Sequence, residues 1–99
     1  MARLTVSPQA EHDAAEIIDL LTREAGTDVA NRYRQGFNDL LARFARYPES
    51  GSPRVRLGRH IRIGVVTPYV IIYELEPDHV MVLRIVDGRR KITRRLVRQ

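Results

Sequence analysis

The chain has 99 residues, of which 29% are charged, with 17 Lys and Arg against 12 Asp and Glu and no cysteine. This length fits a single domain over residues 1–99, and the composition excludes a disulfide scaffold, a cysteine nucleophile and a low-complexity chain. No apolar run approaches the ~20 residues that span a bilayer, and no signal peptide pattern opens the chain, so we expect a cytoplasmic protein with no membrane contact.

The first half of the chain predicts a short strand and then a helix. The segment "RLTVS" alternates apolar and polar residues, as strands do. Ser7 followed by Pro8 is typical of a helix start, because a Ser side chain caps free backbone N–H groups and Pro suits the first helical position. Apolar residues then recur at helical spacing up to Gly26, so the sequence predicts a helix from about Pro8 to Ala25.

A second helix follows directly. Its apolar stripe from Ala30 to Phe44 is the strongest helical pattern in the chain. Thr27 or Asp28 is the expected N-cap, and Pro48 is the expected stop. The short link between the helices predicts a helical hairpin. We expect the outer face of this hairpin to carry mixed charges suited to water: Asp13, Glu16, Arg32 and Arg43.

After the turn-rich stretch "ESGSPRVRLG" the pattern changes to that of strands. The segments "HIRIGVV", "YVIIYELE" and "HVMVLRIV" are rich in β-branched and aromatic residues, and short turns separate them. They predict an antiparallel meander whose nearly all-apolar middle strand is covered by the hairpin on one face and partly covered on the other. In the first strand, Ile61, Ile63 and Val65 should share one face and Arg62 should lie on the other. The expected fold is therefore α+β, with a short N-terminal strand and a helical hairpin packed on an antiparallel β-sheet in the order β-α-α-β-β-β.

The charge is divided unevenly along the chain. Residues 1 to 49 carry 6 basic and 8 acidic residues, a net charge of −2, whereas residues 50 to 99 carry 11 and 4, a net charge of +7. All the basic residues except Lys91 are arginines, and the planar guanidinium suits bidentate contact with carboxylates or phosphates. A genome biased toward Arg codons gives the same count, so composition alone does not decide between the two explanations.

Few side chains suggest chemistry, and each has a simpler interpretation. Glu74 and Glu76 share a strand face, which an exposed strand explains better than a catalytic pair. His60 opens a strand beside arginines and is expected to be an ordinary surface histidine rather than a general acid or base. Tyr69 and Tyr73 also share a face, and we expect them to be core rather than a stacking surface. No metal-binding or phosphate-loop motif is present, so no cofactor or metal is expected.

The remaining candidate is a basic surface. Arg84 lies between Leu83 and Ile85 inside a predicted strand, where an arginine is not needed for solubility unless a partner supplies carboxylates or phosphates. Charge runs are often merely solvated, and that alternative stays open. The expected binding surface comprises Arg62, Arg84, Arg89, Arg90, Lys91, Arg94 and Arg95, with Arg98 beside them.

The order of elements and three segments of the chain resemble the RelE/ParE superfamily of bacterial type II toxins, and more closely its ParE branch. The segment "LTVSPQAEHDAAEII" resembles the usual opening, "RYPESGSPR" resembles the loop after the second helix, and "PYVIIYELEPDHVMVLRIVDGRRKI" resembles the characteristic end. "VLRIVDGRR" is the most specific part, because ParE-like toxins commonly have a V-L-R-V-x-H-G-R-R type sequence there. Asp87 stands where His is common in that sequence.

The resemblance implies a toxin silenced by a cognate ParD-like antitoxin, whose acidic, apolar tail folds as it binds. ParE-like members inhibit DNA gyrase without a known catalytic residue set, whereas RelE-like members are ribosome-dependent mRNA endonucleases that rely on Arg and Lys with a Tyr or His. Val70 and Leu96 stand about where the nucleases have an Arg and a Tyr, which favours the gyrase inhibitor. The alternatives are a RelE-like nuclease and an inactive basic binding module. The resemblance implies that Arg84, Arg89 and Arg90 meet the target or the antitoxin.

Overall fold

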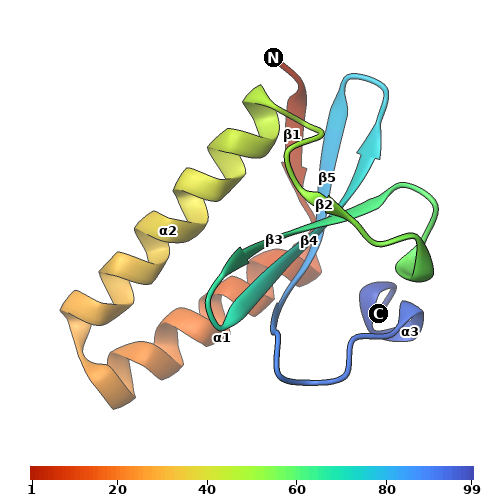
Figure 1. Ribbon diagram of the computed structural model, residues 1–99. Helices are drawn as coiled ribbons and strands as arrows, with labels where there is room; N and C mark the ends of the chain where they lie inside the picture. Colours follow the sequence, from red (N-terminus) through yellow and green to blue (C-terminus); the bar gives the residue numbers. More distant parts are fainter.

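Two helices lie against one face of a five-stranded sheet in the computed structural model, which describes all 99 residues (Figure 1). Along the chain, β1 (Arg3–Val6) precedes α1 (Pro8–Ala25) and α2 (Thr27–Arg46). The remaining elements are β2 (Ser52–Pro53), the 3-10 helix η1 (Val55–Leu57), β3 (Ile61–Val66), β4 (Tyr69–Glu76), β5 (His79–Asp87) and the short α3 (Arg94–Val97). The α+β class, the helical hairpin and the three consecutive strands are confirmed, while β2, η1 and α3 are additional to the prediction. None of the helices combines the length and the apolar character needed to cross a membrane.

The sheet is mixed rather than purely antiparallel. Its strand order is β1-β5-β4-β3-β2, and every neighbouring pair is antiparallel except β1 and β5, which run parallel. The chain between β1 and β5 contains both helices and the other strands, so it is long enough for the crossover that a parallel pair requires. The predicted meander of β3, β4 and β5 is antiparallel, as expected.

The helix ends follow the predicted signals at both ends of α1 and at the end of α2, which stops at Arg46 just before Pro48, but not at the start of α2. The Ser7 hydroxyl accepts a hydrogen bond from the Ala10 N–H at 3.0 Å, which caps α1 as predicted. Gly26 ends α1 with a φ of 93°, a conformation that glycine adopts readily, and it is also the residue before α2. The N-cap predicted at Thr27 or Asp28 is wrong, because the one-residue link makes Gly26 itself the cap and no side chain caps α2.

Apolar side chains cover both faces of the sheet. The core between the sheet and the helical hairpin includes Phe37, Phe44, Tyr69, Ile71 and Tyr73. The second core, on the opposite face, contains residues of η1 and α3 and consists of Leu57, Ile61, Val70, Ile72, Val86, Leu96 and Val97. Because β4 alternates between the two cores, both of its faces are apolar, as predicted, and its two tyrosines are core residues as expected.

The two faces of β3 differ in how far they are covered. Ile61, Ile63 and Val65 share one face, as predicted. Ile61 and Ile63 belong to the second core, but Val65 is 57% exposed, so this core does not reach the end of the strand. On the other face, Gly64 lies against α2. A Cβ at this position would stand 2.5 Å from Cζ of Phe44 and within 3 Å of Leu40, so only glycine fits between the strand and the helix.

Candidate functional site

The basic residues predicted to form one surface occupy separate places in the structure. Arg62 lies on the sheet face toward the helices, opposite the face that α3 covers. Its Nη1 donates hydrogen bonds to the carbonyl oxygens of Glu49 at 2.9 Å and Gly51 at 2.7 Å. Arg62 therefore holds the loop between α2 and β2, and the structure does not bring it together with the arginines near the C-terminus.

Tyr73 holds the same loop from inside the core. Its hydroxyl donates to the Pro48 carbonyl at 2.6 Å and accepts from the Gly51 N–H at 3.0 Å. Its ring packs on that of Phe44, with the ring centroids 4.2 Å apart. Burial raises the pKa of Tyr73, because a phenolate in this position would lose its contact with water. The side chain is thus a neutral anchor for the loop at physiological pH.

Replacing Tyr73 by Phe is expected to lower the free energy of unfolding by about 1–3 kcal/mol, because the Pro48 carbonyl and the Gly51 N–H both lose a buried partner. Urea unfolding of the purified variant measures this loss. Tyr33→Phe is the matched control, since the Tyr33 hydroxyl also donates to a loop carbonyl, that of Thr67 at 3.1 Å, but does so in contact with water. Equal losses in the two variants would contradict the role assigned to the buried hydroxyl.

Arg84 is buried rather than part of an exposed binding surface, which corrects the expectation from its sequence position. It is only 6% exposed. Its Nε donates to Oδ2 of Asp13 at 2.7 Å, its Nη2 donates to Oδ1 at 3.1 Å, and its Nη1 donates to the Leu96 carbonyl at 2.6 Å. Since all three guanidinium nitrogens have a partner inside the protein, Arg84 links α1 to α3 instead of meeting another molecule.

Asp13 is likewise buried, which corrects its predicted place on the outer face of the hairpin. Besides the two bonds from Arg84, it accepts the Ile85 N–H at 3.0 Å. The strand β1 is shorter than β5, so the end of β5 has no strand neighbour on that side. The Ser7 hydroxyl donates to the Leu83 carbonyl there at 2.9 Å. The side chains of Ser7 and Asp13 thus form hydrogen bonds with backbone groups of β5 beyond the end of β1.

The turn after β5 places Arg89, Arg90 and Lys91 in solvent. Asp87 accepts hydrogen bonds from the Arg89 N–H at 2.9 Å, from its Nε at 2.9 Å and from its Nη2 at 2.6 Å. These bonds, chiefly those from the guanidinium, lower the pKa of Asp87 to about 2. Of the seven predicted residues, these three lie in one exposed turn, and Arg89 is the member already held by a carboxylate.

The pKa of Asp87 gives a direct test of this turn. An NMR titration of its carboxyl carbon should give a pKa of about 2, and Arg89→Ala should return the pKa toward 3.8. Because the folded-state pKa is lowered, the pair stabilises the fold above about pH 4, and this contribution is lost as the pH falls toward 2. Arg90→Ala is the control and should shift the pKa far less. An unchanged pKa in the Arg89 variant would rule out the bidentate pair.

Arg94 and Arg95 lie on α3, which packs against η1. The Nε of Arg94 donates to the Arg56 carbonyl at 2.9 Å, and Nη2 of Arg98 pairs with Oε2 of Glu74 at 3.0 Å. The burial of two α3 residues in the second core fixes the position of the helix. This segment lies beside a second group of exposed arginines, in the loop between β2 and β3, which was not part of the predicted surface: Arg54, Arg56 and Arg59.

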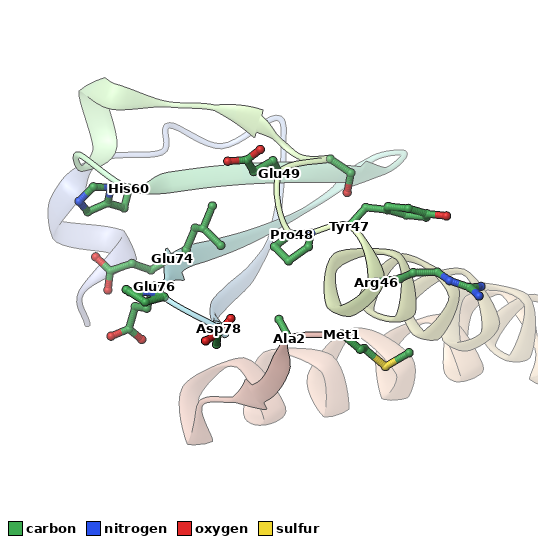
Figure 2. A pocket seen from close by; sticks show the side chains of 13 residues that line it. Met1, Ala2, Arg46, Tyr47, Pro48, Glu49, His60, Glu74, Glu76 and Asp78 are labelled. Carbon is green, nitrogen blue, oxygen red and sulfur yellow. The ribbon is translucent and has the colours of Figure 1, made fainter.

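The largest cavity, of about 1170 Å³, lies away from the turn after β5. Figure 2 shows His60, Glu74 and Glu76 on one side of it and Arg46 and Tyr47 on the other. The two glutamates each pair with a different basic side chain, which disfavours a catalytic carboxylate pair and agrees with the simpler interpretation. No group of three or more His, Asp or Glu side chains lies close enough to hold a metal ion.

Comparisons with known proteins agree with the fold. A family model described as "ParE toxin of type II toxin-antitoxin system, parDE" matches residues 4–92. Toxin ParE3 of Caulobacter vibrioides is 30% identical over 71 residues, which cover 72% of this chain and 71% of that protein. A chain of the "Chromosomal ParDE TA system from P. aeruginosa" shares the fold with a TM-score of 0.75 at 18% identity, over 88% of this chain and 96% of that one.

The chain is therefore the toxin component of a type II toxin-antitoxin system. Within that class it belongs to the ParE toxin family, as the resemblance of its three segments implied.

Proposed function

We propose that this ParE toxin inhibits DNA gyrase and is neutralised by a ParD-like antitoxin. The observation that carries the proposal is the burial of Val70 and Leu96, 8% and 6% exposed, in the second core. These are the positions at which the resemblance places an Arg and a Tyr in the RNA-cleaving branch. Apolar side chains there neither polarise nor protonate a phosphate, so the RNA endonuclease has less support than the gyrase inhibitor.

The other groups suited to proton transfer give the nuclease no better support. Tyr69 and Tyr73 are 7% and 0% exposed, and burial raises the pKa of both. His60 is exposed, but it lies beside Leu75, at the opposite end of β4 from the turn that carries Arg89 and Arg90. A phosphate bound at that turn would therefore have no acid or base beside it from these residues.

The antitoxin partner has support from an apolar groove. The groove has a volume of about 590 Å³ and is lined by 12 residues, 7 of them apolar. Most of these apolar side chains, Phe37 among them, lie on α1 and α2, and the others are Val6 of β1 and Ile85 of β5. The strand β5 continues from Ile85 into the turn that presents Arg89 and Arg90. A segment with apolar and acidic side chains fits both features, since the former fill the groove and the latter pair with the arginines.

Controlled expression in a bacterial host, with separate pulse-labelling of new DNA and new protein, tests the proposal. We expect DNA synthesis to fall first while translation continues, and purified toxin to stop DNA supercoiling by gyrase in vitro. An immediate fall in protein synthesis would favour the ribosome-dependent nuclease instead. A fall in neither would leave an inactive binding module.

A further inference from the structure

Two basic segments that are distant in the sequence meet on one side of the molecule. The short helix α3 lies beside the segment between β2 and β3 (Figure 1) and packs against η1. The Nε of Arg94 donates to the Arg56 carbonyl at 2.9 Å. The arginines of the loop therefore lie beside those of α3 and its end. We name this group the composite patch, and it consists of Arg54, Arg56, Arg59, Arg94, Arg95 and Arg98.

The positive charge of the composite patch is largely free of acidic partners. All six side chains are exposed, and only that of Arg98 forms a salt bridge, with Glu74. Arg54 and Arg94 each donate to a backbone carbonyl, which restrains their side chains without cancelling their charge. No acidic residue occurs in residues 50–60 or 88–99. Such a concentration of arginine attracts a polyanion and suits bidentate contact with phosphate.

The composition of the patch favours a nucleic acid over an acidic protein segment. A protein interface has an apolar centre, whereas Val55, 68% exposed, is the one large apolar side chain exposed in the loop or α3. Interfaces with nucleic acids are instead polar and strongly positive. Single strands are held chiefly by stacking on large aromatic rings, but the exposed Tyr47 lies in the wall of the large cavity and neither basic segment contains Phe, Tyr or Trp. A duplex, bound through its phosphates, fits these features best.

We propose that the composite patch binds the phosphate backbone of duplex DNA without reading its sequence. The inference rests on the proposed function, because gyrase holds duplex DNA and a toxin docked on gyrase would have that duplex beside it. The patch is distinct from the turn at Arg89 and Arg90, so one molecule has separate surfaces for an acidic protein partner and for DNA.

The test measures binding of the purified toxin to a fluorescent duplex of about 30 base pairs, by anisotropy, between about 50 and 200 mM KCl. For wild type we expect the logarithm of the binding constant to fall with the logarithm of the salt concentration with a slope of about −3 to −5. A variant with Arg54, Arg56, Arg59 and Arg95 changed to Gln should bind at least about tenfold more weakly and lose most of that slope.

The matched control removes the same amount of charge elsewhere, with Arg3, Arg23, Arg32 and Arg34 changed to Gln. All eight residues are exposed, so both variants should fold, which thermal unfolding followed by circular dichroism checks. The control should keep wild-type affinity within about twofold and retain the salt slope. Equal losses in the two variants would overturn the proposal, because binding would then follow net charge rather than the composite patch.

Two competitors decide the kind of partner. Unlabelled duplex should displace the probe, whereas tighter binding of single-stranded DNA or of polyglutamate would overturn the assignment to duplex. Gyrase is absent from these measurements, so their outcome is independent of the target. A toxin that binds DNA through the patch but leaves supercoiling unaffected would refute the proposed gyrase inhibition and support DNA binding by the patch. A toxin that blocks gyrase without binding DNA would support the gyrase inhibition and refute DNA binding by the patch.

Discussion

Arg84→Met is expected to lower the free energy of unfolding by about 3–5 kcal/mol, the cost of removing one partner from a buried ion pair. Asp13, only 8% exposed, would be left buried without the guanidinium that pairs with it, and the Leu96 carbonyl would lose its donor. Methionine fills part of the space of the arginine stem, so the loss arises mainly from charge rather than from a cavity. Equilibrium unfolding in urea measures the difference.

A second variant separates charge from packing at this pair. Asp13→Asn combined with Arg84→Met removes both charges and leaves an oxygen for the Ile85 N–H, so it should be clearly more stable than Arg84→Met alone. Arg89→Met is the control in the exposed turn and should lower stability far less than Arg84→Met, because the Arg89 side chain is 78% exposed and water screens its pair with Asp87. An Arg84 variant as stable as the Arg89 variant would show that the buried pair contributes nothing.

The elements that the sequence predicted are those set by local signals. The bounds of α1 match the prediction because Ser7, Pro8 and Gly26 act within their own turn of chain. The three long strands match because each is a continuous run of β-branched and aromatic residues bounded by a turn. The short α3 was missed because its apolar residues, Leu96 and Val97, are interspersed with arginines and are buried only by contact with η1 and with strands distant in the sequence.

The candidate site was less predictable than the fold. The predictions that were wrong concern the direction in which a side chain points, either into the protein or into water. The pairing of β4 with β5 contains a β-bulge. Tyr73 pairs with Val82 and the neighbouring Ile72 pairs with Arg84, so Leu83 has no partner on β4. A simple period of two along β5 does not foresee this bulge. The partner of Arg84 lies 71 residues away, on a helix that was expected to present Asp13 to water. The exposed turn at Arg89 needed no such information, because its residues follow the end of the strand.

Changing Arg89 and Arg90 together to Ala should abolish or strongly reduce toxicity, measured as colony formation after induced expression. Both side chains are exposed in the turn after β5, and their loss removes two positive charges from the surface proposed to meet the target or the antitoxin. Affinity for the antitoxin should fall by about 2 kcal/mol or more if the same turn receives its acidic residues. Isothermal titration of the purified pair measures that change.

Four further variants make this result specific to the turn. Arg32→Ala removes an exposed arginine from the outer face of the hairpin and should leave toxicity and antitoxin affinity unchanged, whereas a loss of more than about 2 kcal/mol would move the interface there.

Arg90→Ala should weaken toxicity more than Arg89→Ala, because Asp87 already holds the Arg89 guanidinium. Asp87→Asn weakens that hold and should preserve toxicity. A double variant at Arg89 and Arg90 that folds normally and remains fully toxic would exclude the turn, and the search for the gyrase contact would then move to the hairpin groove.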